Sequence, residues 1–152
     1  MTRPERTKPV HLPEGGPPQM ELPPPAILEA LGEEGVFALL AAFYVRLEDT
    51  ELRSWFPEDM HEASEHSAAF FVQVMGGRPL FVERHGPPRM RLRHIPFEID
   101  EHARRVWLDA FDATIDGLIE KGRFPGEHAE AFRAFLDGFS SWMVNVAPEA
   151  ET

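Results

Sequence analysis

The sequence predicts an all-α fold. Three observations support this prediction. Apolar residues recur at helical spacing from about residue 26 to residue 147, no segment shows the alternation of a convincing strand, and glycine or proline separates the helical runs. With 152 residues, 43% of them hydrophobic, the chain is long enough for a single domain with one continuous core.

The composition excludes several classes of site and partner. Because cysteine is absent, the chain forms no disulfide, thiolate zinc site, cysteine-ligated iron–sulfur cluster or cysteine nucleophile. A net charge of -11 argues against nucleic acid or an anionic membrane as partner. No apolar run is long enough to span a membrane and the N-terminus is not signal-like, so we expect a cytoplasmic protein.

Proline and glycine crowd residues 1–25, which show almost no apolar periodicity. We therefore expect a flexible, partly polyproline-II arm here, followed by a domain at 26–147 and a disordered tail at 148–152. A plain tail is favoured over an arm that docks a partner. Deleting residues 1–22 is expected to leave the melting temperature nearly unchanged, because the arm has little to bury.

The first half of the domain predicts a short helix over residues 26–31 that ends at Gly32. The apolar face of the next helix contains Val36, Leu40, Phe43, Tyr44 and Leu47. A short helix through Trp55 follows, capped by Asp49 or Thr50. A helix from about Asp59 to Met75 comes next, with one side formed by Met60, Ala63, Ser67, Phe70, Phe71 and Val74.

The helical pattern breaks between Arg78 and Ile99, where five positions are proline or glycine: Pro79, Gly86, Pro87, Pro88 and Pro96. This region predicts mostly loop, with one helical turn ending at His94. A long loop inside a compact domain usually serves a function.

Two further helices complete the domain. Asp100 caps the first. Its inner face holds Ala103, Val106, Trp107, Ala110, Phe111, Thr114, Ile115 and Leu118. After a turn at Gly122 and Pro125, the inner face of the last helix holds Phe132, Phe135, Leu136, Phe139, Trp142 and Met143.

One of the seven histidines stands out. His94 precedes an Ile-Pro step that must leave helical geometry, so it faces whatever Met90, Phe97 and Ile99 enclose. Three arginines at positions 89, 91 and 93 precede it, and a dianionic ligand edge would account for them. On the residues alone, a satisfied core histidine stays the favoured reading.

The other histidines show no such pattern. His61 and His66 are five residues apart, which makes them a poor metal pair. His85 lies in the loop, and the remaining three are expected to be solvated: His11, His102 and His128.

Two inward-facing hydrogen-bond donors lie on separate helices. Tyr44 is the single tyrosine, and Trp107 offers an N–H donor and no acceptor. Together they would suit a ligand that carries partial negative charge. Ordinary aromatic packing is the alternative and stays open.

Taken in order, these residues resemble the group II truncated haemoglobins over roughly residues 25–146. The matching segments are Leu31-Gly32-Glu33-Glu34, Phe43-Tyr44, Phe56-Pro57-Glu58-Asp59, Gly76-Gly77, Arg91-Leu92-Arg93-His94-Ile95-Pro96-Phe97-Glu98-Ile99 and Arg105-Val106-Trp107-Leu108. The resemblance implies a truncated globin fold, a two-over-two helical sandwich around haem b.

The resemblance also implies residue roles. His94 would be the proximal ligand of the haem iron, with Tyr44 as distal phenol and Trp107 as distal indole. Ala63 and Ser67 would be distal positions. The wider haem pocket would include Phe43, Phe56, His66, Phe70, Met90, Arg93, Phe97 and Ile99, of which Phe56 packs on the porphyrin and Arg93 and His66 lie near the propionates.

The implied function is binding of O2 and of other small ligands, namely CO, NO or peroxide. Slow release from two donors would favour storage, sensing or chemistry over transport. A haem redox enzyme, acting as a peroxidase or a nitric oxide dioxygenase, is the alternative. A haem-free helical interaction module is a third hypothesis. A homodimer and an unidentified reductase stay open as partners.

Overall fold

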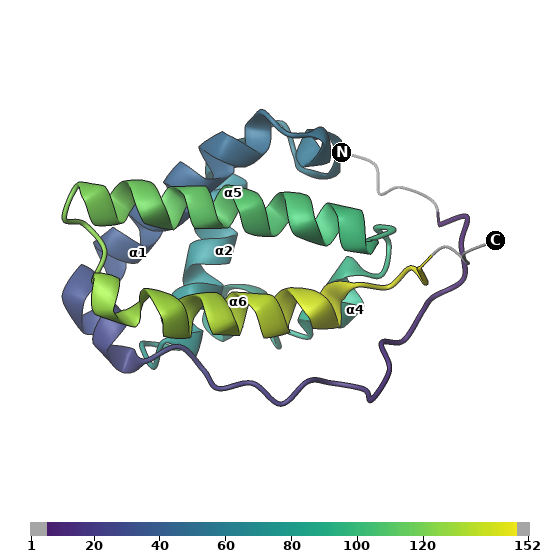
Figure 1. The fold of residues 1–152 in the computed structure, drawn as a ribbon, viewed down its shortest axis with the longest axis horizontal. Coiled ribbons are helices and arrows are strands. Elements are labelled where there is room, and N and C mark those ends of the chain that lie inside the picture. Colours follow the sequence, from purple (N-terminus) through teal and green to yellow (C-terminus); the bar gives the residue numbers. More distant parts are fainter. Residues whose placement is uncertain (1–5, 149–152) are drawn as a thin grey trace.

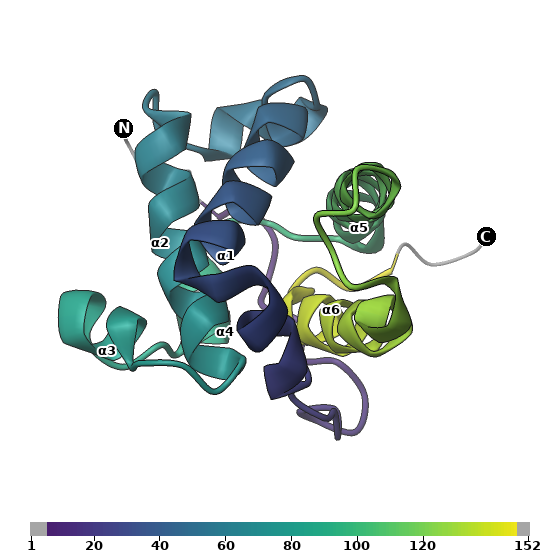
Figure 2. The same ribbon diagram turned by 90° about the vertical axis from the view of Figure 1, so that its left-hand side faces the viewer.

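Two pairs of helices form the body of the protein. In the computed structural model, which describes residues 6–148, α1 (Pro25–Glu48) and α2 (Met60–Val74) cross on one side. α5 (Glu101–Glu120) and α6 (Ala129–Met143) lie side by side on the other (Figures 1 and 2). The described residues contain no strand, which confirms the all-α prediction and the two-over-two arrangement.

The predicted break at Gly32 is a kink within α1. Gly32 has φ 69° and ψ 170°, outside the helical region, and helical geometry continues on both sides. A side chain at Gly32 would meet no other atom within 4 Å, so the positive φ rather than crowding calls for glycine. The chain thus forms the two predicted helices as one bent element.

Short polar caps begin three of the elements. Thr50 caps the 3₁₀-helix η1 (Glu51–Trp55) by accepting from the Leu52 N–H, at 3.2 Å. Asp59 accepts from the Glu62 N–H at the start of α2, at 3.0 Å. Asp100 accepts from the Ala103 N–H at the start of α5, at 2.8 Å, as predicted.

The region from Arg78 to Ile99 is more helical than predicted. It contains α3 (Leu80–His85) as well as α4 (Met90–His94), where a single turn was expected. Pro79 lies just before α3 and Gly86, with φ 80°, just after it. Proline before a helix and glycine after it are common at helix ends, so these residues bound a helix rather than prevent one.

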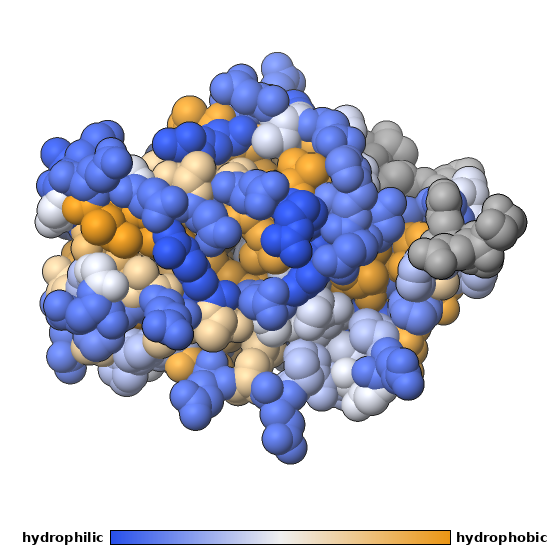
Figure 3. Space-filling view, in the orientation of Figure 1, coloured by the Kyte–Doolittle hydropathy of each residue, from blue (hydrophilic) through white to orange (hydrophobic). Residues whose placement is uncertain are grey.

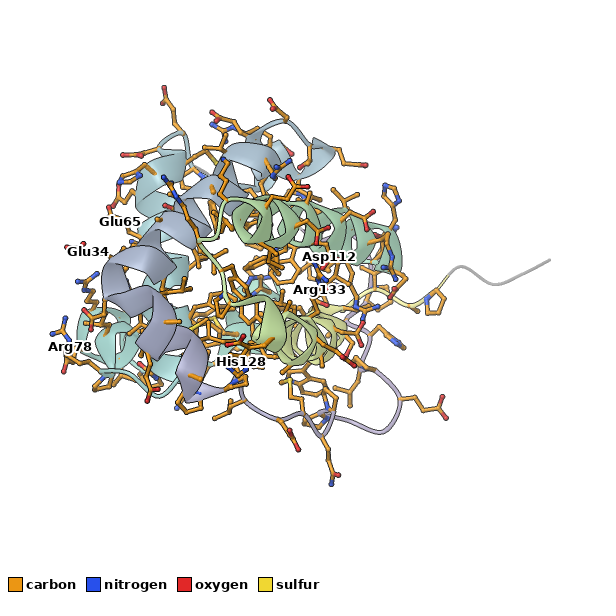
Figure 4. The ribbon with its side chains drawn as sticks, turned by 60° about the vertical axis from the view of Figure 1, so that its left-hand side comes forward. Glu34, Glu65, Arg78, Asp112, His128 and Arg133 are labelled. Atoms are coloured by element: carbon orange, nitrogen blue, oxygen red, sulfur yellow. The ribbon has the colours of Figure 1, made fainter. Side chains whose placement is uncertain are left out.

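Aromatic packing joins the two helix pairs. Phe111 of α5 is fully buried, stacks on Phe43 of α1 at 4.0 Å between ring centroids, and meets Phe132 of α6 edge-on. At the α5–α6 surface, Arg133 lies beside Asp112, with Nε and Oδ1 3.3 Å apart (Figure 4). The short 3₁₀-helix η2 (Gly126–His128) leads into α6.

The described part of the N-terminal arm, residues 6–24, runs along the edge of α6 before α1 begins (Figure 1). Pro23 is buried, and Met20 packs so closely on Gly138 that a Cβ there would lie 3.1 Å from its side chain. The flexibility of this arm stays a prediction. Residues 1–5 and 149–152 lie outside the described residues, so the predicted tail is described only at its start.

Polar side chains cover much of the face formed by α5 and α6, with apolar surface between them (Figure 3). Among residues 6–148, no helix is both long and apolar enough to cross a membrane.

Candidate functional site

A cavity of about 580 Å³ lies between the helix pairs. Its lining is mainly apolar and aromatic, and it includes every residue that the sequence singled out for the site. These residues are Phe43, Tyr44, Phe56, Ala63, His66, Ser67, Phe70, Met90, Arg93, His94, Phe97, Ile99 and Trp107. Helices α1, α2, α4 and α5, the end of η1 and the loop after α4 therefore bring the predicted residues together around one space.

His94 ends α4 and is held at its ring. Its Nδ1 lies 2.6 Å from the Met90 carbonyl oxygen. Because a carbonyl only accepts, Nδ1 carries the proton and Nε2 keeps a lone pair. Burial lowers the pKa of His94, and the positive charge of Arg93 lowers it further, against the opposing effect of the Met90 contact. The ring is thus a neutral imidazole with one nitrogen available to a metal.

Tyr44 and Ser67 place two hydroxyl groups on another part of the wall. The Tyr44 phenol on α1 is hydrogen-bonded to the Ser67 hydroxyl on α2. Burial raises the pKa of Tyr44, and the bond to Ser67 opposes that shift. Either oxygen can be the donor, so the pair offers the cavity a neutral hydroxyl group of adjustable direction.

Trp107 reaches the cavity from α5. It meets the ring of Phe43 edge-on, with centroids 5.5 Å apart and planes at 86°. Among the described residues, no hydrogen bond uses its indole N–H. Phe56 meets Tyr44 edge-on at 5.4 Å. Aromatic contacts therefore fix the ring positions, and the polar groups of Tyr44 and Trp107 share one chamber.

The register of α2 divides its side chains between two environments. Ala63, His66 and Ser67 line the cavity, whereas Ser64 is buried elsewhere and donates to the His61 carbonyl oxygen at 2.6 Å. His61 itself is exposed and does not line the cavity. The expectation that His61 and His66 do not share a site therefore agrees with their placement.

The arginines around α4 do not form the single cluster that the sequence suggested. Arg93 lines the cavity, and it donates to the carbonyl oxygens of His85, Pro87 and Pro88, at 2.8, 3.0 and 2.6 Å. Arg91 donates instead to the carbonyl oxygens of Trp142 and Val144 at the end of α6, at 2.6 and 2.8 Å. The prediction of a shared dianionic partner is therefore wrong for Arg91, because carbonyl oxygens at the C-terminal end of α6 bind its guanidinium.

His85 does not line the cavity, but it lies against a residue that does. Its ring centroid is 4.2 Å from that of His66. Burial lowers the pKa of His85, and the neighbouring His66, Arg93 and Arg84 act in the same direction. His85 is therefore an outer neighbour of the site.

Sequence reasoning missed Arg104 and Ser140, which also line the cavity. Arg104 is largely buried and donates to Ser140 Oγ at 3.0 Å and to Asp137 Oδ1 at 2.6 Å, which ties α5 to α6. The one local signal was Glu101, three residues earlier, whose carboxylate lies 2.6 Å from Arg104. The partners on α6 are not evident from sequence spacing.

The residues present fit a haem group. The cavity volume lies within the range of about 300–1,000 Å³ that cofactor and ligand sites show. The lining is mainly apolar and contains two imidazoles, of which His94 is neutral with its Nδ1 held by the Met90 carbonyl oxygen, and Arg93 and Arg104 supply guanidinium groups on the wall. An apolar slot with one nitrogen ligand and basic groups is what a planar, dianionic iron porphyrin requires.

The chain is similar in sequence and fold to known proteins. The model of the family described as bacterial-like globin matches residues 26–144. The group 2 truncated haemoglobin YjbI of Bacillus subtilis is 37% identical over 89 residues, which are 58% of this chain and 67% of that protein.

Solved structures agree. The group II truncated haemoglobin of Bacillus anthracis superposes with a TM-score of 0.73 at 30% identity, covering 87% of this chain and 95% of that one. A truncated oxygen-avid haemoglobin of Bacillus subtilis gives 0.71 at 34% identity, covering 78% and 98%. The match to the family model, the two-over-two helices and these relatives together show that the chain belongs to the bacterial-like globins, as a group II truncated haemoglobin.

Proposed function

We propose that the cavity binds haem b with His94 as the proximal axial ligand, and that the protein holds O2 there. The observation that carries the proposal is the His94 ring. Its Nδ1 is occupied by the Met90 carbonyl oxygen at 2.6 Å, its pKa is lowered by burial, and it lies on the wall of an apolar cavity of about 580 Å³. A histidine with one nitrogen held and the other free is a pre-formed axial ligand.

Membership of the truncated haemoglobins implies a haem-binding globin. When bound, haem supplies an iron whose sixth position is open to a diatomic gas. Apolar side chains of the wall, Phe56, Phe70 and Phe97 among them, would exclude water from a bound haem. Arg93 and His66 lie on the same wall and provide positive or proton-donating groups for the propionates.

Tyr44 and Trp107 give the pocket its preference for a ligand with partial negative charge. Both side chains line the cavity, and both end in a donor group. A hydrogen bond to a charged group is worth about 1.5–3 kcal/mol, which corresponds to about 10- to 100-fold in residence time. A relative of this fold is described as oxygen-avid, and the two donors offer a reason for slow release of O2 here as well.

Absorption spectra of the purified protein test the proposal. We expect a Soret band, a ferrous form that binds O2 and CO, and a 1:1 ratio of haem to chain after reconstitution. A protein that takes up no haem from a slight excess would contradict the proposal and leave the helical interaction module. Peroxide and nitric oxide turnover, measured on the same sample, separate storage from redox chemistry.

A further inference from the structure

The loop that follows His94 has little regular structure of its own. Residues 95–99 include Pro96, and the backbone carbonyls here have few partners within the loop. Phe97 N–H donates to the His94 carbonyl oxygen at 3.0 Å, and Ile95 N–H to that of Leu92 at 3.3 Å. Such a loop needs donors from elsewhere in the chain, because unpaired backbone oxygens in a half-buried position are costly.

Asn145, fully buried after the end of α6, supplies part of this need. Its side-chain amide donates to the His94 carbonyl oxygen at 3.2 Å, and its Oδ1 accepts from the Ile99 N–H at 3.0 Å. Its own backbone N–H donates to the Ile99 carbonyl oxygen at 2.9 Å. One side chain thus joins both ends of the loop to the C-terminal end of α6.

Arg6, in the N-terminal arm, supplies the rest. Its Nη1 donates to the carbonyl oxygens of Ile95 and Phe97, at 2.8 and 3.2 Å, and to Asn145 Oδ1 at 2.8 Å. Its Nη2 donates to the Asn145 carbonyl oxygen at 3.0 Å and to that of Pro9 at 3.2 Å. The guanidinium therefore contacts the loop, the residue that anchors the loop, and the arm itself.

Further contacts hold the arm beside the loop. Glu98 accepts hydrogen bonds from the Thr7 N–H, from the Thr7 hydroxyl at 3.0 Å and from the Lys8 N–H at 3.2 Å. His11 N–H donates to the Asn145 carbonyl oxygen at 2.9 Å, and Arg91 donates to the His11 carbonyl oxygen. The segment from Arg6 to His11, which we name the proximal strap, is thus bound at both of its ends.

We propose that Arg6 is a positioning residue for His94: the proximal strap fixes the loop that sets where the imidazole stands, so that release of the strap loosens the axial ligand. The inference rests on the proposed role of His94 as haem ligand. Arg6 touches neither the ring nor the cavity, and it acts through the carbonyls of residues 95 and 97 and through Asn145.

The contacts of the strap change what is expected of the N-terminal arm. Proline-rich composition suggested an arm whose deletion changes little. The composition of the arm is indeed poor in apolar residues, but the strap acts through polar contacts with backbone, which hydrophobic periodicity does not reveal. Removal of residues 1–22 is now expected to speed haem loss.

The test compares three full-length variants with the wild type. Arg6→Ala removes the guanidinium, and Arg6→Lys keeps the charge but offers a single nitrogen in place of the fork. Lys8→Ala is the matched control, because Lys8 lies in the same strap and makes its hydrogen bonds to Glu98 and Arg6 through its backbone. The measurements are haem transfer to apomyoglobin, the iron–histidine stretching band of the ferrous form, and amide hydrogen exchange of Phe97 and Ile99.

Arg6→Ala is expected to raise the rate of haem loss about tenfold or more, to shift or broaden the iron–histidine band, and to speed exchange of the Phe97 and Ile99 amides, with α1 amides unchanged. Arg6→Lys is expected to be intermediate and Lys8→Ala to match the wild type. A general loss of stability would instead speed exchange throughout and leave the band in place.

The proposal is overturned if Arg6→Ala and Lys8→Ala give the same band and the same exchange rates at Phe97 and Ile99. Failure of the haem assignment is recognised separately, because the wild type itself would then show no Soret band. Hydrogen exchange of the four haem-free proteins would still report whether Arg6 holds the loop.

Discussion

The two sides of the cavity are built by different means. On one side, Tyr44, Ser67 and Trp107 project from α1, α2 and α5, and their positions follow from regular helices packed through aromatic rings. On the other side, His94 begins a loop whose carbonyls are bound by Arg6 and Asn145. Packing positions the first set of side chains, and hydrogen bonds to backbone position the second.

This difference separates two kinds of sensitivity. Removing a buried aromatic side chain costs about 3–5 kcal/mol and acts on the whole fold. A single hydrogen bond contributes about 0.5–1.5 kcal/mol, so its loss changes one segment and leaves the rest folded. Variants on the aromatic side should therefore alter global stability, and variants on the hydrogen-bonded side should alter the local site.

The largest effect is expected from replacing His94, on the hydrogen-bonded side of the cavity. His94→Ala should abolish haem binding or weaken it severely, because the wall of the cavity offers His66 as its one other imidazole among the described residues. The measurement is the haem content and the Soret spectrum after reconstitution.

His85→Ala is the control, since His85 lies outside the cavity and should keep the wild-type spectrum. A five-coordinate histidine-ligated spectrum in His94→Ala would contradict the assignment, and the double variants His66→Ala/His94→Ala and His85→Ala/His94→Ala would then show which histidine has replaced it.

The aromatic side is tested by Phe111→Ala. Phe111 is fully buried and stacks on Phe43, and its ring also meets Trp107 edge-on at 5.3 Å. The substitution should lower the free energy of unfolding by about 3–5 kcal/mol, because the cavity left between α1 and α5 cannot fully close. Urea unfolding of the haem-free protein measures it.

Val45→Ala, at an exposed position on α1, is the matched control and should change the free energy of unfolding by less than about 0.5 kcal/mol. A loss below about 1.5 kcal/mol in Phe111→Ala would mean that the aromatic core is not what fixes this side of the cavity.

A smaller and purely local effect is expected from Tyr44→Phe. The ring is kept, so the packing against Phe56 should survive while the hydroxyl is lost. If the phenol of the wild type donates to O2, the release of O2 from Tyr44→Phe should be about 10- to 100-fold faster. CO affinity should change less, because bound CO carries less negative charge. Stopped-flow displacement of O2 measures the rate.

Ser67→Ala tests whether the phenol prefers Ser67 or bound O2 as its partner, because Tyr44 is hydrogen-bonded to Ser67 in the structure. An unchanged O2 release rate in Tyr44→Phe would mean that the phenol stays with Ser67, and Trp107 would remain as the donor. Trp107→Phe is a less direct test, since the smaller ring also leaves space.

The same division explains what the sequence could predict. On the helical side, spacing alone placed Phe43, Tyr44 and Trp107 on inner faces. The cap at Asp100 was predicted, and of the two candidates Asp49 and Thr50 the structure shows Thr50 as the cap. Helical periodicity links neighbours three or four residues apart, so the register of a helix follows from local sequence.

The hydrogen-bonded side was predicted less well. The Ile-Pro context singled out His94, and its role as haem ligand came from the resemblance to the truncated haemoglobins. The partners of the loop were not predicted, because Arg6 and Asn145 are separated from it by 89 and 51 residues. The sequence does not predict helix α3, because proline and glycine usually break a helix, whereas Pro79 and Gly86 lie at the ends of this one. Polar contacts between distant residues leave no periodic signal.

The smallest predicted effect concerns the pH dependence of the strap. Hydrogen bonds from the Thr7 backbone and hydroxyl and from the Lys8 backbone, together with the Lys8 charge, lower the pKa of Glu98, and burial opposes the shift. A carboxyl whose pKa is lower in the folded protein stabilises it above the unfolded-state pKa, near 4.5, and loses this contribution as the pH falls through the folded-state value.

Glu98→Gln keeps an oxygen that can accept from Thr7 and Lys8 but removes the charge, so the variant should lose this acid-dependent part of the attachment. We expect its melting temperature to fall less than that of the wild type between about pH 6 and pH 3, by a few degrees at most for an exposed group.

Glu34→Gln, which neutralises an exposed carboxylate on α1 (Figure 4), changes the net charge equally and should follow the wild type. If the three proteins lose stability in parallel, Glu98 is not an anchor of the strap, and the contacts of Arg6 and His11 hold it. If Glu98→Gln also removes an acid-induced rise in the rate of haem loss, the contacts of Glu98 and Arg6 act together on the position of His94. Among the described residues, the helical side of the cavity has no such attachment.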